Sequence, residues 1–232
     1  MIALVLLLLL QPAPADRADA DRLFELGTAL VAEGDTAGAV AAWEGARATG
    51  WTAAAVEHNL GTVALGQGDA PRARLHLERA ARLAPADEAV RQNLRLARER
   101  LGIPAASPVE VAWARASAVV PPAGWVALAL ALVFGAVGLA LAGRRRGAGG
   151  LGVVAAAAVV IAGLAVWGAT QAEGIVLLDQ AVVAEAPSPT APAVARLRAG
   201  EAVRLGEATE GWREVRVDGE AGWVPEAAVA PL

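Results

Sequence analysis

The sequence predicts a multidomain membrane protein that combines all-α helical repeats, a two-helix transmembrane hairpin and a small all-β barrel. Three patterns support this fold class: a 34-residue repeat near the start, two long uncharged runs in the middle, and short alternating strand patterns at the end. Hydrophobic residues make up 56% of the 232 residues and the mean hydropathy is +0.46, which favours long apolar segments.

The repeat covers residues 20–53 and 54–87, and the matching positions lie 34 residues apart. The matching pairs are Gly27/Gly61, Gly34/Gly68, Asp35/Asp69, Ala39/Ala73, Trp43/Leu77 and Ala46/Ala80. A period of this length with Leu-Gly in a first helix and small residues in a second resembles tetratricopeptide (TPR) repeats. We expect the glycines to allow close helix packing and the aspartates to cap the second helix of each pair.

The end of the repeats has its own pattern. Pro85 occupies the terminal position of the second repeat, whereas Trp51 stands at that position in the first. Asn93-Leu94 matches Asn59-Leu60, so residues 87–101 predict a capping helix and the helical region extends over 20–102.

The resemblance to TPR repeats implies a protein-binding groove lined by first-helix residues. The positions on that side are Asp21, Phe24, Thr28, Val31, Ala55, His58, Thr62, Leu65 and Gln92. Exposure of Phe24, Val31 and Leu65 would favour an apolar ligand over an anionic one.

Residues 1–15 predict a signal peptide. The apolar stretch Met1–Leu10 is too short to cross a bilayer, and Ala13-Pro14-Ala15 fits the small-x-small rule of signal cleavage. A basic segment before the apolar stretch is missing, and an amphipathic or anchor segment is the alternative.

Two uncharged runs after a connector over residues 103–122 predict transmembrane helices over residues 123–143 and 150–170. The loop between them, residues 144–149, carries Arg144, Arg145 and Arg146 and would therefore be cytoplasmic, with both flanking domains on the other side. Small residues suited to close packing of this hairpin are Gly135, Gly138, Ala158, Ala162 and Gly163.

Residues 175–232 predict short strands, with turns at Asp218-Gly219 and Ala199-Gly200-Glu201. Alternation places Val215 and Val217 in the core and Trp212 on the opposite face. Trp212 and Trp223 could form an aromatic binding surface, and packing over an open end of the barrel is the alternative.

This last segment resembles bacterial SH3 domains. The resemblance rests on Gly200-Glu201, Trp212, Gly219 and Gly222-Trp223-Val224, and it makes the predicted barrel SH3-like. The chain end is also similar to the G-x-x-P-x-x-Y-V end of eukaryotic SH3 modules. Because Ala228 stands where those modules have tyrosine, binding of PxxP peptides is not implied.

The order of the segments resembles BatE-type proteins of the bacterial aerotolerance (Bat) operon. This resemblance implies membrane-protein partners, among them VWA-domain proteins and a MoxR-type ATPase system. The predicted hairpin, its basic loop and the signal-like start together predict a multi-pass protein of the bacterial inner (cytoplasmic) membrane, in contact with the lipid bilayer, whose soluble domains both face the periplasm or exterior. The family assigns no catalytic residue.

No motif for catalysis or cofactor binding stands out. The chain has no cysteine, and its two histidines, His58 and His76, lack the spacing of a metal site. Nucleophile and phosphate-binding motifs are missing, so we expect no enzymatic activity, cofactor or metal. The net charge of −4 argues against a nucleic-acid partner.

We therefore expect a membrane-anchored adaptor or scaffold that displays TPR and SH3-like domains outside the cytoplasm, as part of a stress or aerotolerance complex. The alternative is a module that binds peptidoglycan or another envelope component through Trp212 and Trp223. A third option is that both domains only orient a larger membrane complex.

Overall fold

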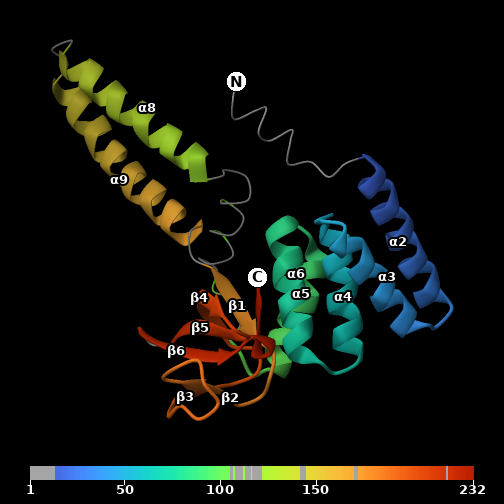
Figure 1. Ribbon diagram of the computed structural model, residues 1–232. Helices are drawn as coiled ribbons and strands as arrows, with labels where there is room; N and C mark the ends of the chain where they lie inside the picture. The colour runs from blue at the N-terminus through green and yellow to red at the C-terminus, as the bar shows by residue number, and fades with distance from the viewer. Residues whose placement is uncertain are drawn as a thin grey trace. The chain divides into compact units, whose positions relative to one another are not determined.

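A computed structural model describes residues 14–104, 107, 112, 116, 122–141, 145–169, 172–217 and 219–232. The chain divides into two units, residues 1–105 and 106–232. In their described parts, the first unit is helical and the second contains a helical hairpin and an antiparallel sheet (Figure 1). Most of the predicted signal peptide, most of the connector and Arg144 lie outside the described residues.

The helical unit is a row of helices joined by short turns (Figure 1). Its helices are α2 (Pro14–Ala32), α3 (Thr36–Ala48), α4 (Ala54–Gly66), α5 (Ala70–Leu83) and α6 (Glu88–Arg100). Helix α2 packs on α3, α4 packs on α5, and α6 packs on α5 and, less extensively, on α4. Each helix therefore buries its apolar side against its neighbours in sequence.

The turns inside the two helix pairs repeat one geometry. Gly34 and Gly68 have φ angles of 85° and 81°, in the left-handed region that favours glycine. Asp35 and Asp69 follow them, and each carboxylate accepts a backbone N–H from the first turn of the next helix, at 2.9 and 3.2 Å. The predicted aspartate caps are confirmed, while assignment to the TPR family stays a prediction.

Two glycines allow the helices of each pair to approach closely. A β-carbon at Gly27 would lie 2.6 Å from Cδ1 of Trp43, and one at Gly61 would lie 2.6 Å from Cγ of Leu77. Trp43 and Leu77 are 3% and 0% exposed. A buried side chain thus occupies the space left by each glycine, as the repeat pattern predicts.

Replacing one of these glycines tests the close approach. We expect Gly61→Ala to lower the free energy of unfolding by roughly 1–3 kcal/mol, since overpacking outweighs the gain in helix propensity. The matched control is Gly66→Ala in the same helix, where a new β-carbon meets no atom within 4 Å. Urea unfolding of the full chain, followed by circular dichroism at 222 nm, compares the two variants. If the two variants had equal urea midpoints, contact with Leu77 would not restrict the size of the side chain at position 61.

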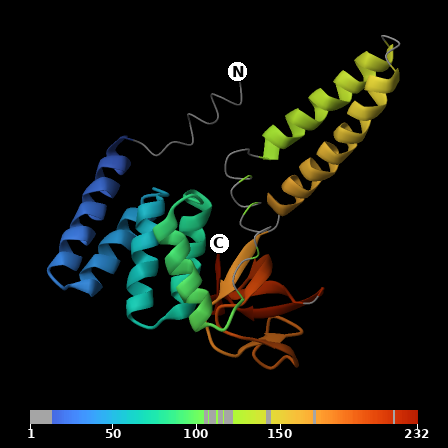
Figure 2. The ribbon, with the colours of Figure 1, turned by 180° about the vertical axis from the view of Figure 1, so that it is seen from behind.

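The second unit begins with a hairpin of two helices, α8 (Pro122–Leu141) and α9 (Arg145–Ala169). The helices lie side by side in both views (Figures 1 and 2). Ala129, Ala158 and Ala162 are buried between them, which confirms the predicted small-residue packing for Ala158 and Ala162. Added β-carbons at Gly138 and Gly163 would meet no atom within 4 Å.

Across the described segments, no helix reaches the combination of length and apolar character that a membrane crossing requires. The predicted fold class, a membrane protein with a transmembrane hairpin over residues 123–143 and 150–170, is therefore wrong. Alanines in the apolar runs serve helix–helix packing, and composition alone does not separate that use from a membrane span. The predicted loop also differs, because Arg145 and Arg146 open α9. The orientation inferred from Arg144, Arg145 and Arg146 depended on that span.

The sheet follows the hairpin in sequence, and its strand pairs are antiparallel in the order β3-β2-β6-β5-β4-β1-β7. The strands are β1 (Glu173–Val176), β2 (Ala181–Ala184), β3 (Ala193–Leu197), β4 (Ala202–Thr209), β5 (Trp212–Val217), β6 (Glu220–Pro225) and β7 (Val229–Pro231). A 3₁₀ helix, η1 (Glu226–Ala228), joins β6 to β7.

One face of the sheet forms a small valine-rich core. Val176, Val215 and Val224 are fully buried in it, and Val217 packs at its margin. The predicted core positions Val215 and Val217 are therefore confirmed. Gly219, with a φ angle of 93°, lies in the tight connection between β5 and β6, where the sequence predicts a turn; Asp218 is outside the described residues.

Candidate functional site

The residues predicted to line a groove differ in exposure. Asp21, Thr28 and Gln92 are exposed, Val31 is 43% exposed, and Phe24, His58 and Thr62 take part in contacts described below. Leu65 is only 5% exposed and packs in a core with Ala64, Ala73, Leu77 and Ala97. The predicted exposure of Leu65 is wrong because α6, which carries Ala97, covers this end of α4.

An aromatic contact links α2 to the connection between α3 and α4. The rings of Phe24 and Trp51 meet edge to face, with centroids 5.8 Å apart and planes at 84°. The Arg17 guanidinium lies 4.8 Å from the centroid of the Trp51 ring, a cation–π arrangement, and also pairs with Asp21 at 3.1 Å. Trp51 was not among the predicted site residues. Trp51 stands at the position that Pro85 holds in the second repeat, and this difference could have indicated a special role for Trp51.

A polar contact links α4 to α6. Asn93 Nδ2 lies 3.1 Å from His58 Nε2 and donates to Thr62 Oγ1 at 2.9 Å, while Thr62 Oγ1 donates to the His58 carbonyl at 2.8 Å. The structure thus brings two predicted residues, His58 and Thr62, together through a third that the prediction missed. Asn93 adjoins the predicted Gln92 and matches Asn59 in the repeat, which could have indicated it.

Behind this face, a buried ionic group joins α4 to α5. Glu57 Oε2 lies 2.7 Å from His76 Nδ1 and 3.9 Å from the Arg79 guanidinium, and Glu57 and His76 are 5% and 8% exposed. Burial lowers the pKa of Arg79 from its usual value, and the charge of Glu57 opposes that shift. These contacts fix the orientation of α4, which carries His58 and Thr62.

Removing the Glu57 carboxylate should destabilise the helical unit. We expect Glu57→Ala to lower the free energy of unfolding by about 1–3 kcal/mol, because the buried His76 loses its carboxylate partner. Glu25→Ala, an exposed change on α2, is the control and should shift stability by less than about 0.5 kcal/mol. Urea unfolding followed by circular dichroism measures both. If both variants changed the free energy of unfolding by similar amounts, the buried Glu57–His76 pair would make no net contribution to stability.

The tryptophans of the sheet lie on its outer face, defined here as the face opposite the valine core. Trp212 pairs with Pro225 across β5 and β6, and Trp223 pairs with Glu214. Since successive side chains alternate between faces, both tryptophans point away from Val215. They are diagonal neighbours, a spacing of roughly 7–8 Å that aromatic side chains can bridge. Both are partly buried, and their use as a binding surface stays a prediction.

Residues 179–231 match the bacterial SH3 domain family. The chain contains a bacterial SH3 domain. The matched span begins before β2, reaches β7 and includes both tryptophans. A search of curated proteins found no match. The relation to BatE-type proteins and to TPR repeats therefore remains a prediction from the sequence.

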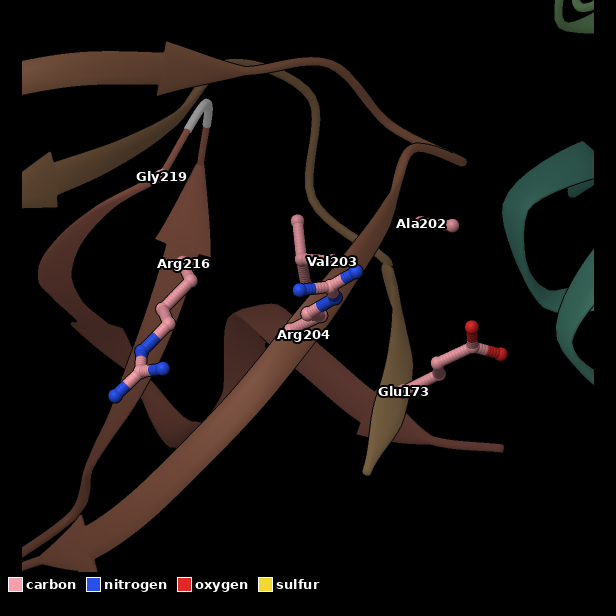
Figure 3. A pocket seen from close by; sticks show the side chains of 6 residues that line it. All are labelled: Glu173, Ala202, Val203, Arg204, Arg216 and Gly219. Carbon is pink, nitrogen blue, oxygen red and sulfur yellow. The ribbon is translucent and has the colours of Figure 1, made fainter. Parts of the chain in front are cut away.

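A depression of about 580 Å³ lies on the sheet that includes the SH3 domain (Figure 3). It is lined by Glu173, Ala202, Val203, Arg204, Arg216 and Gly219. Arg204 pairs directly with Glu173 on β1 and with Arg216 on β5. In Figure 3, the side chain of Arg204 stands between those of Glu173 and Arg216. Apart from Gly219, which was predicted as a turn residue, these residues carry no sequence signal of a shared site, because they meet only through strand pairing.

The chemistry of these surfaces suits recognition. They offer aromatic rings, guanidinium groups and amide or hydroxyl groups, all common in binding contacts. Within the described ranges, no three metal-ligating side chains are grouped to hold a metal ion.

Proposed function

We propose that this protein is an interaction adaptor whose bacterial SH3 domain and helical unit each bind a partner protein. The observation that carries the proposal is the placement of Trp212 and Trp223 beside each other on the outer face of the SH3 domain. Neither belongs to the valine core, so the core does not account for them. Tryptophan is enriched among residues that contribute most to binding.

The helical unit supports the proposal with a second surface. Thr28 and Val31 lie one turn apart on α2, and Gln92 is exposed on α6. The Asn93 contacts hold α4 and α6 together beside Gln92, so less conformational freedom would be lost there on binding. With Val31 exposed, this face suits an apolar helix or extended segment.

The partners follow from the resemblance in segment order to BatE-type proteins. We propose VWA-domain proteins and a MoxR-type ATPase system, acting in stress or oxygen tolerance, as the first partners to test. The SH3 domain and the helical face would then join two members of one assembly.

Changing the tryptophans tests the SH3 domain as a binding site. We expect the double variant Trp212→Ser and Trp223→Ser to weaken binding of a partner at least about 10-fold, as for residues at an interface centre. The control is Leu178→Ser, which removes an apolar side chain that is 51% exposed on the same sheet unit. Tagged full-length proteins are crosslinked in native extracts, and the captured proteins are quantified by mass spectrometry. Identical capture by the double variant and the control would contradict the proposal.

Charge changes on α2 test the helical surface. We expect Thr28→Asp with Val31→Asp to remove a different set of captured proteins, because buried carboxylates oppose an apolar contact. Leu26→Asp with Ala29→Asp, exposed changes on another side of the same helix, should leave that set intact. Circular dichroism confirms that both variants fold. Loss of the same proteins from both would indicate a general charge effect and not a site.

Binding to the cell envelope is a second candidate function, favoured by the same outer-face tryptophans in a bacterial SH3 domain. Co-sedimentation of the full chain with purified peptidoglycan, lost in the tryptophan double variant, would support this function over the adaptor. If the double variant co-sedimented as strongly as the unchanged protein, envelope binding through the tryptophans would be excluded.

A further inference from the structure

The two arginines that line the depression have an unfavourable electrostatic interaction with each other. Arg204 and Arg216 are directly opposite each other across β4 and β5, and like charges in that position destabilise a sheet. Both are exposed on the outer face, so neither fills the valine core. Packing of the valine core therefore does not explain why two cationic side chains lie opposite each other here.

Among the residues that line the depression, one positive charge is in excess. Glu173 lies beside Arg204 in the strand pairing and offsets one of the two guanidinium charges. Arg216 makes no ion pair with any residue that the structure describes. By contrast Arg213, on the same strand, pairs with Glu226 at 3.0 Å. Glu214 lies on the same face of β5, two residues from Arg216, but it is not part of the lining, and its carboxylate accepts the Glu207 backbone N–H at 3.4 Å. Within the lining, the excess charge is thus at Arg216, beside the Gly219 turn.

We propose that this depression binds a carboxylate from an extended segment of the partner protein. The planar guanidinium group matches a carboxylate through two parallel hydrogen bonds. The adjacent Glu173 favours a singly charged group over a doubly charged phosphate. The volume of about 580 Å³ falls within the range of small-ligand sites and can hold a side chain with its neighbouring backbone.

The strand geometry also predicts the separation between the acidic and the apolar residue of the ligand. Arg216 and Trp212 lie on the same face of β5, four residues apart, which corresponds to roughly 13–14 Å. An extended peptide bound along β5 would therefore carry an acidic residue about four positions from an apolar one. This inference rests on the proposal that the SH3 domain binds a partner, and it names the chemistry of that partner.

Nuclear magnetic resonance of the full chain, labelled with nitrogen-15, tests the site. The probes are two short peptides, acetyl-Leu-Ser-Ser-Ser-Glu-amide and acetyl-Glu-Ser-Ser-Ser-Leu-amide, which cover both chain directions, and their neutral twins with Gln in place of Glu. The signals followed are the Arg216 Nε–H and the Trp212 indole N–H. We expect one acidic peptide to shift both signals saturably, and its neutral twin to bind about 10-fold more weakly or less.

Variants provide the control for charge. Arg216→Gln should weaken binding of the acidic peptide about 10-fold, whereas Arg198→Gln, the same charge change at another exposed position of the SH3 domain, should not. Arg216→Glu should abolish binding and raise the thermal midpoint, because it replaces a like-charge pair with an opposite-charge pair across β4 and β5. A raised midpoint also shows that the variant is folded.

Three results would overturn the proposal. Equal binding of the acidic and neutral peptides, or unchanged binding by Arg216→Gln, would exclude a carboxylate contact at Arg216. The same shifts with inorganic phosphate would indicate a general anion site. A lack of saturable shifts with any probe would exclude the site. In each case, loss of captured partners by the tryptophan double variant would still support the adaptor function.

Discussion

The pairing register of β5 with β6 decides both what the sheet buries and what it presents. Val215 and Val224 point into the core, so Trp212, Arg216 and Trp223 must point away from it. A shift of one residue would exchange the two faces and expose the valines. The sheet can therefore keep its core only by presenting aromatic and cationic groups on its outer face. The chemistry of the outer face is thus a consequence of the packing that stabilises the sheet.

Local features of the helical unit could be predicted from the sequence because they depend on few residues. A left-handed turn followed by a capping carboxylate needs only Gly34-Asp35 or its repeat at Gly68-Asp69. The burial of Leu65 could not be predicted in this way, because it depends on how α6 docks against α4. The contacts of Trp51 and Asn93 likewise join segments distant in sequence. For the sheet, alternation predicted the core, while the Arg204–Arg216 pair required the strand order.

The predicted membrane hairpin failed for a different physical reason. A bilayer and a packed helix pair both favour alanine, valine and leucine, so the two environments produce similar sequence runs. Ala129, Ala158 and Ala162 are buried between α8 and α9, and their small size brings the helices together. Composition could therefore predict two apolar helices with a packed contact, and it could not decide their surroundings.

The two repeat positions held by Trp51 and Pro85 differ in what makes them stiff. Pro85 restricts its own backbone, and its carbonyl accepts a hydrogen bond from Arg91 at 3.1 Å. Trp51 leaves its backbone unrestricted, and its side chain contacts Phe24 and Arg17 and packs against the core that contains Trp43 and Val56. The first junction thus depends on side chains that a single substitution can remove, whereas the second is set in part by the backbone itself.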